Sequence, residues 1–180
     1  QAIAEGFEIL SYAASGRLRD GQPAVALLRQ LRLDGSIAII PWGFGKWTGK
    51  RKSALLNLVR SGEPFFHLGD NGGRPRIWPY PDIFRAARKR GMLILPGSDP
   101  LPLPEEWKRI AEVGFCMQGR LSAEYPGADL SSLLYGNRPR VEPYGRRLSL
   151  PDFIRKQVQL RYLSGFLHCM QTKNDCGNSA

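Results

Sequence analysis

The stretch that decides the predicted fold is Ile37–Trp47, IAIIPWGFGKW, an apolar run that ends in a glycine-rich, aromatic loop. The same pattern recurs at Pro64–Pro75, PFFHLGDNGGRP, and at Met92–Pro100, MLILPGSDP. Stretches with helical spacing separate the three runs, and strands that alternate with helices form parallel sheets. Because the loops after parallel strands open at one end of the sheet, we expect the polar residues there to form one site.

Further elements extend this pattern in both directions. An earlier strand is expected at Phe7–Tyr12, and four segments have the apolar spacing of helices: Gln22–Leu33, Ser53–Val59, Pro81–Arg90 and Ser149–Leu163. We therefore predict an α/β protein with a parallel, barrel-like sheet, an incomplete or distorted (β/α) barrel of the TIM type, followed by a C-terminal helical extension. The barrel-like core would span residues 1–120, the extension residues 121–170, and a flexible tail residues 171–180.

The composition points to anionic partners. The chain of 180 residues has a formal net charge of +10 and a pI near 10.0, which favours phosphorylated small molecules or nucleic acid. The basic run in Arg85–Arg90 is either a solvated helix face or part of an anion-binding surface. No apolar stretch is long enough to span a membrane, and no signal peptide is visible.

The cysteines favour a reducing compartment. Three cysteines cannot all pair, so we interpret them as free thiols and expect a cytoplasmic protein, with a small loop closed by Cys169 and Cys176 as the alternative. The sequence does not reveal the oligomeric state.

Three residues after the predicted strands are candidates for catalysis and for holding a metal. Asp99 directly follows an apolar run and is flanked by Gly97 and Pro100, which suits a metal ligand or a general base, or equally a turn cap. His67 and Asp70 end the preceding run. The alternatives are a packed histidine between sheet and helix, and an aspartate in a turn.

A second group of candidates would bind the substrate. Lys46, Arg51 and Arg74 offer positive charge for an anion, and Trp42 and Trp47 offer faces on which a sugar or base can stack. The loop lacks the spacing of a P-loop, so nucleotide binding by that route is not supported. The alternative for the two tryptophans is an aromatic plug that closes the end of the sheet.

A resemblance to a known family appears between Ser36 and Phe115. The pattern Ala-Ala-x-x-x-Gly at Ala86–Gly91, then LILPGSD at Leu93–Asp99 and Gly-Phe at Gly114–Phe115, resembles the last βα unit of the polymerase-and-histidinol-phosphatase (PHP) superfamily. That resemblance implies a metal-dependent phosphoesterase on a distorted barrel, in which the aspartate of a Gly-Ser-Asp-x-His motif binds metal.

The sequence lacks several of the metal-binding residues of the PHP pattern. Asp99 matches the motif's aspartate, but its histidine position is Leu101. The family's His-Pro element would fall at Ile40-Pro41, where there is no histidine, and its N-terminal His-x-His motif is absent.

Together these patterns predict a PHP-like, metal-dependent hydrolase of the phosphoesterase type, or a diverged descendant, that acts on an anionic and phosphorylated ligand. A divalent metal (Mn, Zn or Mg) held by Asp99 with His67 or Asp70 would lower the pKa of a bound water. The alternative is a non-catalytic protein that binds an anion or nucleic acid through the same basic and aromatic residues.

Overall fold

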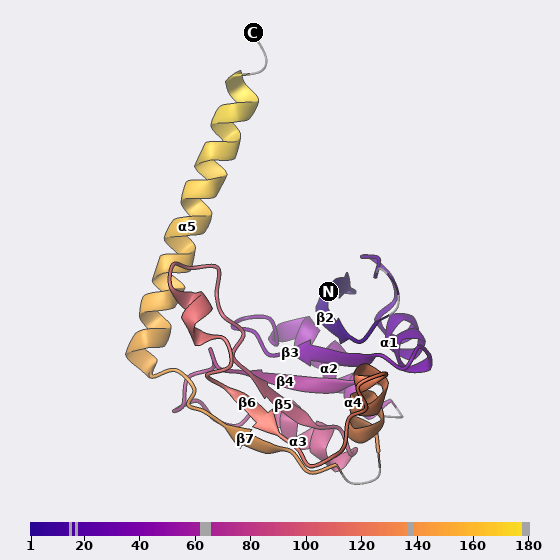
Figure 1. Cartoon of the computed structure of the whole chain (residues 1–180). Coiled ribbons are helices and arrows are strands. Elements are labelled where there is room, and N and C mark those ends of the chain that lie inside the picture. The colour runs from indigo at the N-terminus through magenta and orange to yellow at the C-terminus, as the bar shows by residue number, and fades with distance from the viewer. Residues whose placement is uncertain (15, 17, 62–65, 137–138, 178–180) are drawn as a thin grey trace.

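An open, mixed five-stranded sheet organises the molecule (Figure 1). The computed structural model describes residues 1–14, 16, 18–61, 66–136 and 139–177, and describes side chains as far as residue 163. The sheet order is β1-β2-β3-β4-β5. The strand bounds are Ala2–Ala4 for β1, Phe7–Tyr12 for β2, Ile37–Pro41 for β3, His67–Asn71 for β4 and Ile94–Gly97 for β5.

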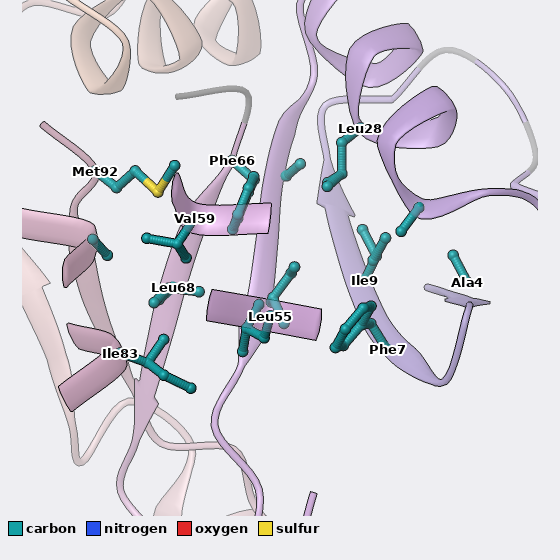
Figure 2. Close-up of a cluster of buried hydrophobic side chains, with 14 of the residues drawn as sticks. Ala4, Phe7, Ile9, Leu28, Leu55, Val59, Phe66, Leu68, Ile83 and Met92 are labelled. Atoms are coloured by element: carbon teal, nitrogen blue, oxygen red, sulfur yellow. The ribbon is translucent and has the colours of Figure 1, made fainter. Parts of the chain in front are cut away.

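Three helices cover one face of this sheet, which we call the helix face. They are α1 (Ala24–Leu33), α2 (Gly49–Arg60) and α3 (Asp82–Lys89), and each presents an apolar stripe at helical spacing. Side chains from the three helices and from β1 to β5 form one buried cluster, part of which is shown in Figure 2. The central members are fully buried: Ile9, Leu28, Leu55, Phe66, Leu68 and Phe84.

The prediction of a parallel, barrel-like sheet is wrong. Strands β3, β4 and β5 are parallel and joined by α2 and α3, but β2 runs antiparallel to β3 and β1 runs antiparallel to β2. Tyr12 pairs with Ile37, so β3 begins beside the point where β2 ends. The segment that holds α1 therefore acts as a hairpin connection and not as a crossover, and the described strands form an open sheet.

The opposite face of the sheet, which we call the open face, is covered only in part. Helix α4 (Pro126–Leu134) packs there against β3 and β5, and the antiparallel pair of β6 (Gly114–Cys116) and β7 (Glu142–Tyr144) lies next to β5. A short 3-10 helix, η1 (Glu106–Arg109), precedes β6.

The chain ends in a long helix, α5 (Leu150–Gly177), whose C-terminal half extends away from the rest of the structure (Figure 1). Ser149 precedes it and accepts a hydrogen bond from the backbone N–H of Asp152, which is an N-cap contact. The helix continues through most of the predicted tail, and residues 178–180 lie outside the described residues. The predicted boundaries at residues 120 and 170 stay predictions.

Two strands extend further than the sequence indicates. Within the run Pro64–Pro75 the apolar residues predict a strand only over Phe65–Leu68, whose first residue lies outside the described residues, and the strand observed is His67–Asn71. Within Met92–Pro100 they predict a strand over Met92–Leu95, and the strand observed is Ile94–Gly97. Residues that were expected in loops, Asp70 among them, therefore alternate between the two faces of the sheet. This shift decides how the candidate site is built.

Candidate functional site

Asn71 joins the loops that follow the three parallel strands. Its Nδ2 donates hydrogen bonds to the backbone carbonyl of Trp42, at 2.7 Å, and to Oδ2 of Asp99, at 2.8 Å. Both partners are acceptors, so the amide nitrogen must face them and Oδ1 must point elsewhere. The geometry thus brings Trp42 and Asp99 to one end of the sheet, as the sequence predicts, through a residue that was not among the predicted site residues.

Asp99 is held in an unusual environment. Its backbone φ is +43°, in the left-handed region that aspartate tolerates better than most residues. Burial raises the pKa of its carboxyl group, the hydrogen bond from Asn71 opposes that rise, Glu8 adds to it and Lys46 opposes it. In the part of the chain that the structure describes, Asp99 forms no ion pair within 4.0 Å.

Lys46 lies at the same end of the sheet but is paired. Its Nζ forms an ion pair with Glu8 from β2, and its alkyl chain lies so close over Gly43 that a Cβ there would clash with it. Lys46, Asn71 and Asp99 line a cavity of about 200 Å³ together with side chains of α5. The sequence predicts that the positive charge of Lys46 binds an anion, but in the structure the carboxylate of Glu8 already balances that charge.

The aromatic residues at this end contact one another. Trp42 packs edge-on against Trp78, with ring centroids 5.7 Å apart, and Phe153 of α5 packs against both Trp78 and Phe44. Trp47 lies on the helix face, where its ring contacts a buried phenylalanine of α3 at 5.4 Å. This arrangement matches the aromatic plug, and stacking of a ligand on either tryptophan stays a prediction.

Asp70 points to the opposite face from Asn71, as neighbouring residues in a strand must. Its two carboxylate oxygens accept hydrogen bonds from Nε and Nη2 of Arg74, at 2.7 and 2.8 Å. Arg74 is only 2% exposed, so this is a buried, bidentate ion pair. Burial raises the pKa of Asp70, and the hydrogen bonds and charge of Arg74 oppose that rise.

His67 lies at the other end of β4. By the strand rise of about 3.3 Å per residue, its Cα is about 13 Å from that of Asn71. Its Nδ1 accepts a hydrogen bond from the backbone N–H of Leu93 at 3.2 Å, and its ring stacks on Tyr135 at 4.6 Å. Burial, with a contribution from Arg32, lowers the pKa of His67 to about 4. These contacts match the packed histidine.

The three predicted metal ligands are therefore not brought together. Asp99 lies at one end of the sheet and His67 lies at the other end. The side chain of Asp70 points to the helix face. Among the residues that the structure describes, no group of three or more histidine, cysteine or acidic residues is close enough to hold a metal ion. A divalent metal at Asp99 stays a prediction.

A second cavity, of about 520 Å³, lies on the helix face next to β5, and we call it the arginine pocket. Its charged and hydroxyl-bearing lining residues are Asp70, Arg74, Tyr80, Arg88, Tyr144 and Arg147. Nη1 of Arg147 lies 3.8 Å from Oδ2 of Asp70, an ion pair that is too long for a hydrogen bond. Arg51, the remaining predicted anion-binding residue, is exposed on α2 and does not line this pocket.

The predicted site residues did not include Asn71, Tyr80 or Arg147, and Arg88 was covered only by the alternative that the run Arg85–Arg90 is part of an anion-binding surface. The alternation of His67, Gly69 and Asn71 on one face with Leu68 and Asp70 on the other could have identified Asn71, had the strand been extended. No local signal links Arg147 to Asp70, because the two are far apart in the chain.

Comparison with known proteins adds no relative. No family model, no curated protein and no solved structure matches the chain. In the described residues, the helices are all too short or too polar to cross a membrane. The resemblance to the PHP superfamily therefore stays a prediction from the sequence.

Proposed function

We propose that this protein is a non-catalytic binding protein for a small phosphorylated anion, and that the arginine pocket is the binding site. The proposal follows the alternative function that the sequence left open. It moves the site from the ends of the parallel strands to the helix face, because Lys46 is paired with Glu8 and the predicted metal ligands are dispersed.

One observation carries this proposal: two buried hydrogen-bond donors of the pocket have no acceptor. Oη of Tyr80 and Nη1 of Arg147 are both buried, and neither donates a hydrogen bond of normal geometry to an acceptor in the described part of the chain; the guanidinium group of Arg88 approaches Oη of Tyr80, but only as a donor. A buried donor without a partner costs about 1–3 kcal/mol. An oxyanion in the pocket would accept a hydrogen bond from each of them.

The charges of the pocket favour the same ligand. Three guanidinium groups and one carboxylate line the pocket, and each nitrogen of Arg74 donates a hydrogen bond, two to Asp70 and one to the carbonyl of Trp78. Arg88 and Arg147 are left with a positive charge that Asp70 does not balance. A planar guanidinium suits a phosphate because it can donate two parallel hydrogen bonds.

The shape of the pocket favours a small molecule over nucleic acid. Its volume of about 520 Å³ lies within the range of about 300–1,000 Å³ that is usual for small-molecule sites. Ion pairs with Asp70 would account for the positions of Arg74 and Arg147, but they leave the hydroxyl of Tyr80 and Nη1 of Arg147 without a hydrogen-bond acceptor.

The experiment is calorimetric titration with inorganic pyrophosphate. Arg147→Gln should weaken binding about tenfold or more, because a hydrogen bond to a charged group contributes about 1.5–3 kcal/mol. The matched control is Arg90→Gln, which removes the same charge from the exposed end of α3, outside the pocket. It should change the affinity less than about twofold, since exposed charges are screened.

The variant Tyr80→Phe distinguishes binding at the arginine pocket from general electrostatic attraction of the anion to a basic protein. It removes only the hydroxyl, so it should weaken pyrophosphate binding severalfold while leaving the ligand-free protein at least as stable. Equal losses in Arg147→Gln and Arg90→Gln, with none in Tyr80→Phe, would refute the proposed site.

A further inference from the structure

The open face of the sheet contains a third cavity, which is separate from the arginine pocket. It has a volume of about 620 Å³, and we call it the open-face pocket. Most of its wall is apolar and comes from β2, β3, β5, β6 and α4: Leu10, Ile37, Ile39, Leu95, Phe115 and Leu134. Its size and apolar wall are those of a site for a small organic molecule.

Glycines help to make this pocket hollow. Gly69 and Asn71 lie on the same face of β4, and Gly97 pairs with Asn71 on β5. A Cβ built on Gly97 would meet no atom within 4 Å, although the residue lines the pocket. Since the φ of Gly97 is not in the left-handed region, a larger side chain could be placed there without backbone strain. The empty volume is thus due to a missing side chain and not to a forced backbone.

Two side chains at one end of the pocket, Asn71 and Asp99, present hydrogen-bond acceptors, and the neighbouring Ser98 adds a hydroxyl group. Both hydrogens of the Asn71 amide are donated, and its buried Oδ1 has no hydrogen-bond partner among the described residues. Asp99 receives a hydrogen bond from that neutral amide, but no cation of the described chain pairs with it. The nearby ammonium group of Lys46 is already paired with Glu8.

Burying a carboxylate without a cation raises the free energy of the folded protein, and a ligand that brings a positive charge offsets this increase. We propose that the open-face pocket binds a small apolar amine, whose protonated amino group donates to Asp99 and Asn71 and whose apolar body lies against β3, β5 and α4. The apolar wall and the negative charge of Asp99 together disfavour an anion here. This inference does not depend on the proposed function: the two pockets meet at Pro96 and Val113, but Asp99 lines only the open-face pocket and Arg147 lines only the arginine pocket.

The test uses three probes with the same phenylethyl body: 2-phenylethylamine, 2-phenylethanol and 3-phenylpropionate. Titration is followed by the backbone amide resonances of Asn71 and Gly97 in the full chain. We expect the amine to bind at least about tenfold more tightly than the alcohol, and the carboxylate to bind most weakly. A carboxylate that binds as tightly as the amine, or an amine that leaves both resonances unchanged, would overturn the proposal.

Two variants separate the charge from the cavity. Asp99→Asn retains an acceptor for the Asn71 amide and tolerates the positive φ, so it should lower the amine's affinity to that of the alcohol and leave the alcohol's affinity unchanged. Asp34→Asn, an exposed residue at the end of α1, is the charge-matched control and should change neither. Gly97→Leu should abolish binding of both probes, and Gly97→Ala covers the case in which the leucine variant does not fold.

A metal is the competing occupant of the acceptor end. Titration with Mn²⁺ alone tests it, because paramagnetic broadening reports binding near the Asn71 resonance. Broadening that Asp99→Asn removes, in a protein that does not bind the amine, would assign the site to a cation and overturn the amine proposal. Failure here would leave pyrophosphate binding by Arg147 and Tyr80 untouched.

Discussion

Protonation of His67 should destabilise this protein by an amount that the structure defines. The side chain is 1% exposed, and its Nδ1 accepts the backbone N–H of Leu93. Acceptance at Nδ1 places the proton of the neutral ring on Nε2, which is buried with no hydrogen-bond partner among the described residues. Adding a second proton would break the bond to Leu93 and place a buried cation within the field of Arg32.

The magnitude follows from the shift in pKa. Burial, then Arg32, lowers the pKa of His67 from 6.5 to about 4 in the folded state. Between these values the unfolded chain binds a proton that the folded chain does not, so the stability that the neutral ring contributes is complete above pH 6.5 and is lost as the pH falls. The slope is about 1.4 kcal/mol per pH unit, which gives about 3 kcal/mol by pH 4.

The assay is urea denaturation at several pH values between 4 and 7, on the wild type and on His67→Asn. Asparagine places an acceptor near the position of Nδ1 but does not titrate. It should lower the overall stability, because the ring contact with Tyr135 is lost, yet its free energy of unfolding should depend less on pH. Every other titrating group is present in both proteins, so the difference between their pH profiles isolates the contribution of His67. Parallel pH profiles would refute the assignment of His67 as a buried neutral group.

Two further predictions concern stability. Arg74→Met should cost about 3–5 kcal/mol in urea denaturation, because it removes both hydrogen bonds that the buried carboxylate of Asp70 accepts and leaves only the longer ion pair with Arg147, whereas Arg76→Met at an exposed neighbour should stay within about 0.5 kcal/mol. Leu55→Ala, at a fully buried position of α2, should lower the free energy of unfolding by about 2–5 kcal/mol; a loss no greater than that of Leu33→Ala, at an 87% exposed position of α1, would contradict the packing in Figure 2.

The candidate site could be predicted only in part, because the sequence does not show how far β4 extends and hence which side chains alternate between the two faces of the sheet. The sequence indicates that Trp42, Lys46 and Asp99 lie at one end of the sheet, and the structure places all three around one cavity. It also groups Asp70 with them, because Gly69-Asp70-Asn71-Gly72 has the composition of a turn. Once β4 extends to Asn71, adjacent side chains must point to opposite faces, which separates Asp70 from Asp99.

Local periodicity is what the sequence by itself determined. The apolar stripes of α1, α2 and α3 and the apolar run of β3 are properties of short segments, because a helix or strand that must bury one face repeats its apolar residues at a fixed spacing. The same alternation places Phe66 in the buried cluster on the helix face and its neighbour His67 on the opposite face, against Tyr135.

The direction of β2 and the makeup of the pockets were decided only by the tertiary structure. An apolar stripe on α1 is the same whether the helix crosses over to a parallel strand or returns beside an antiparallel one, so no local pattern distinguishes an open mixed sheet from a barrel. Arg147 reaches Asp70, and Phe153 reaches Phe44, across long stretches of chain. Contacts of this kind depend on how the whole chain packs, because the free energy that forms them comes from burial shared by many segments and not from the residues on either side.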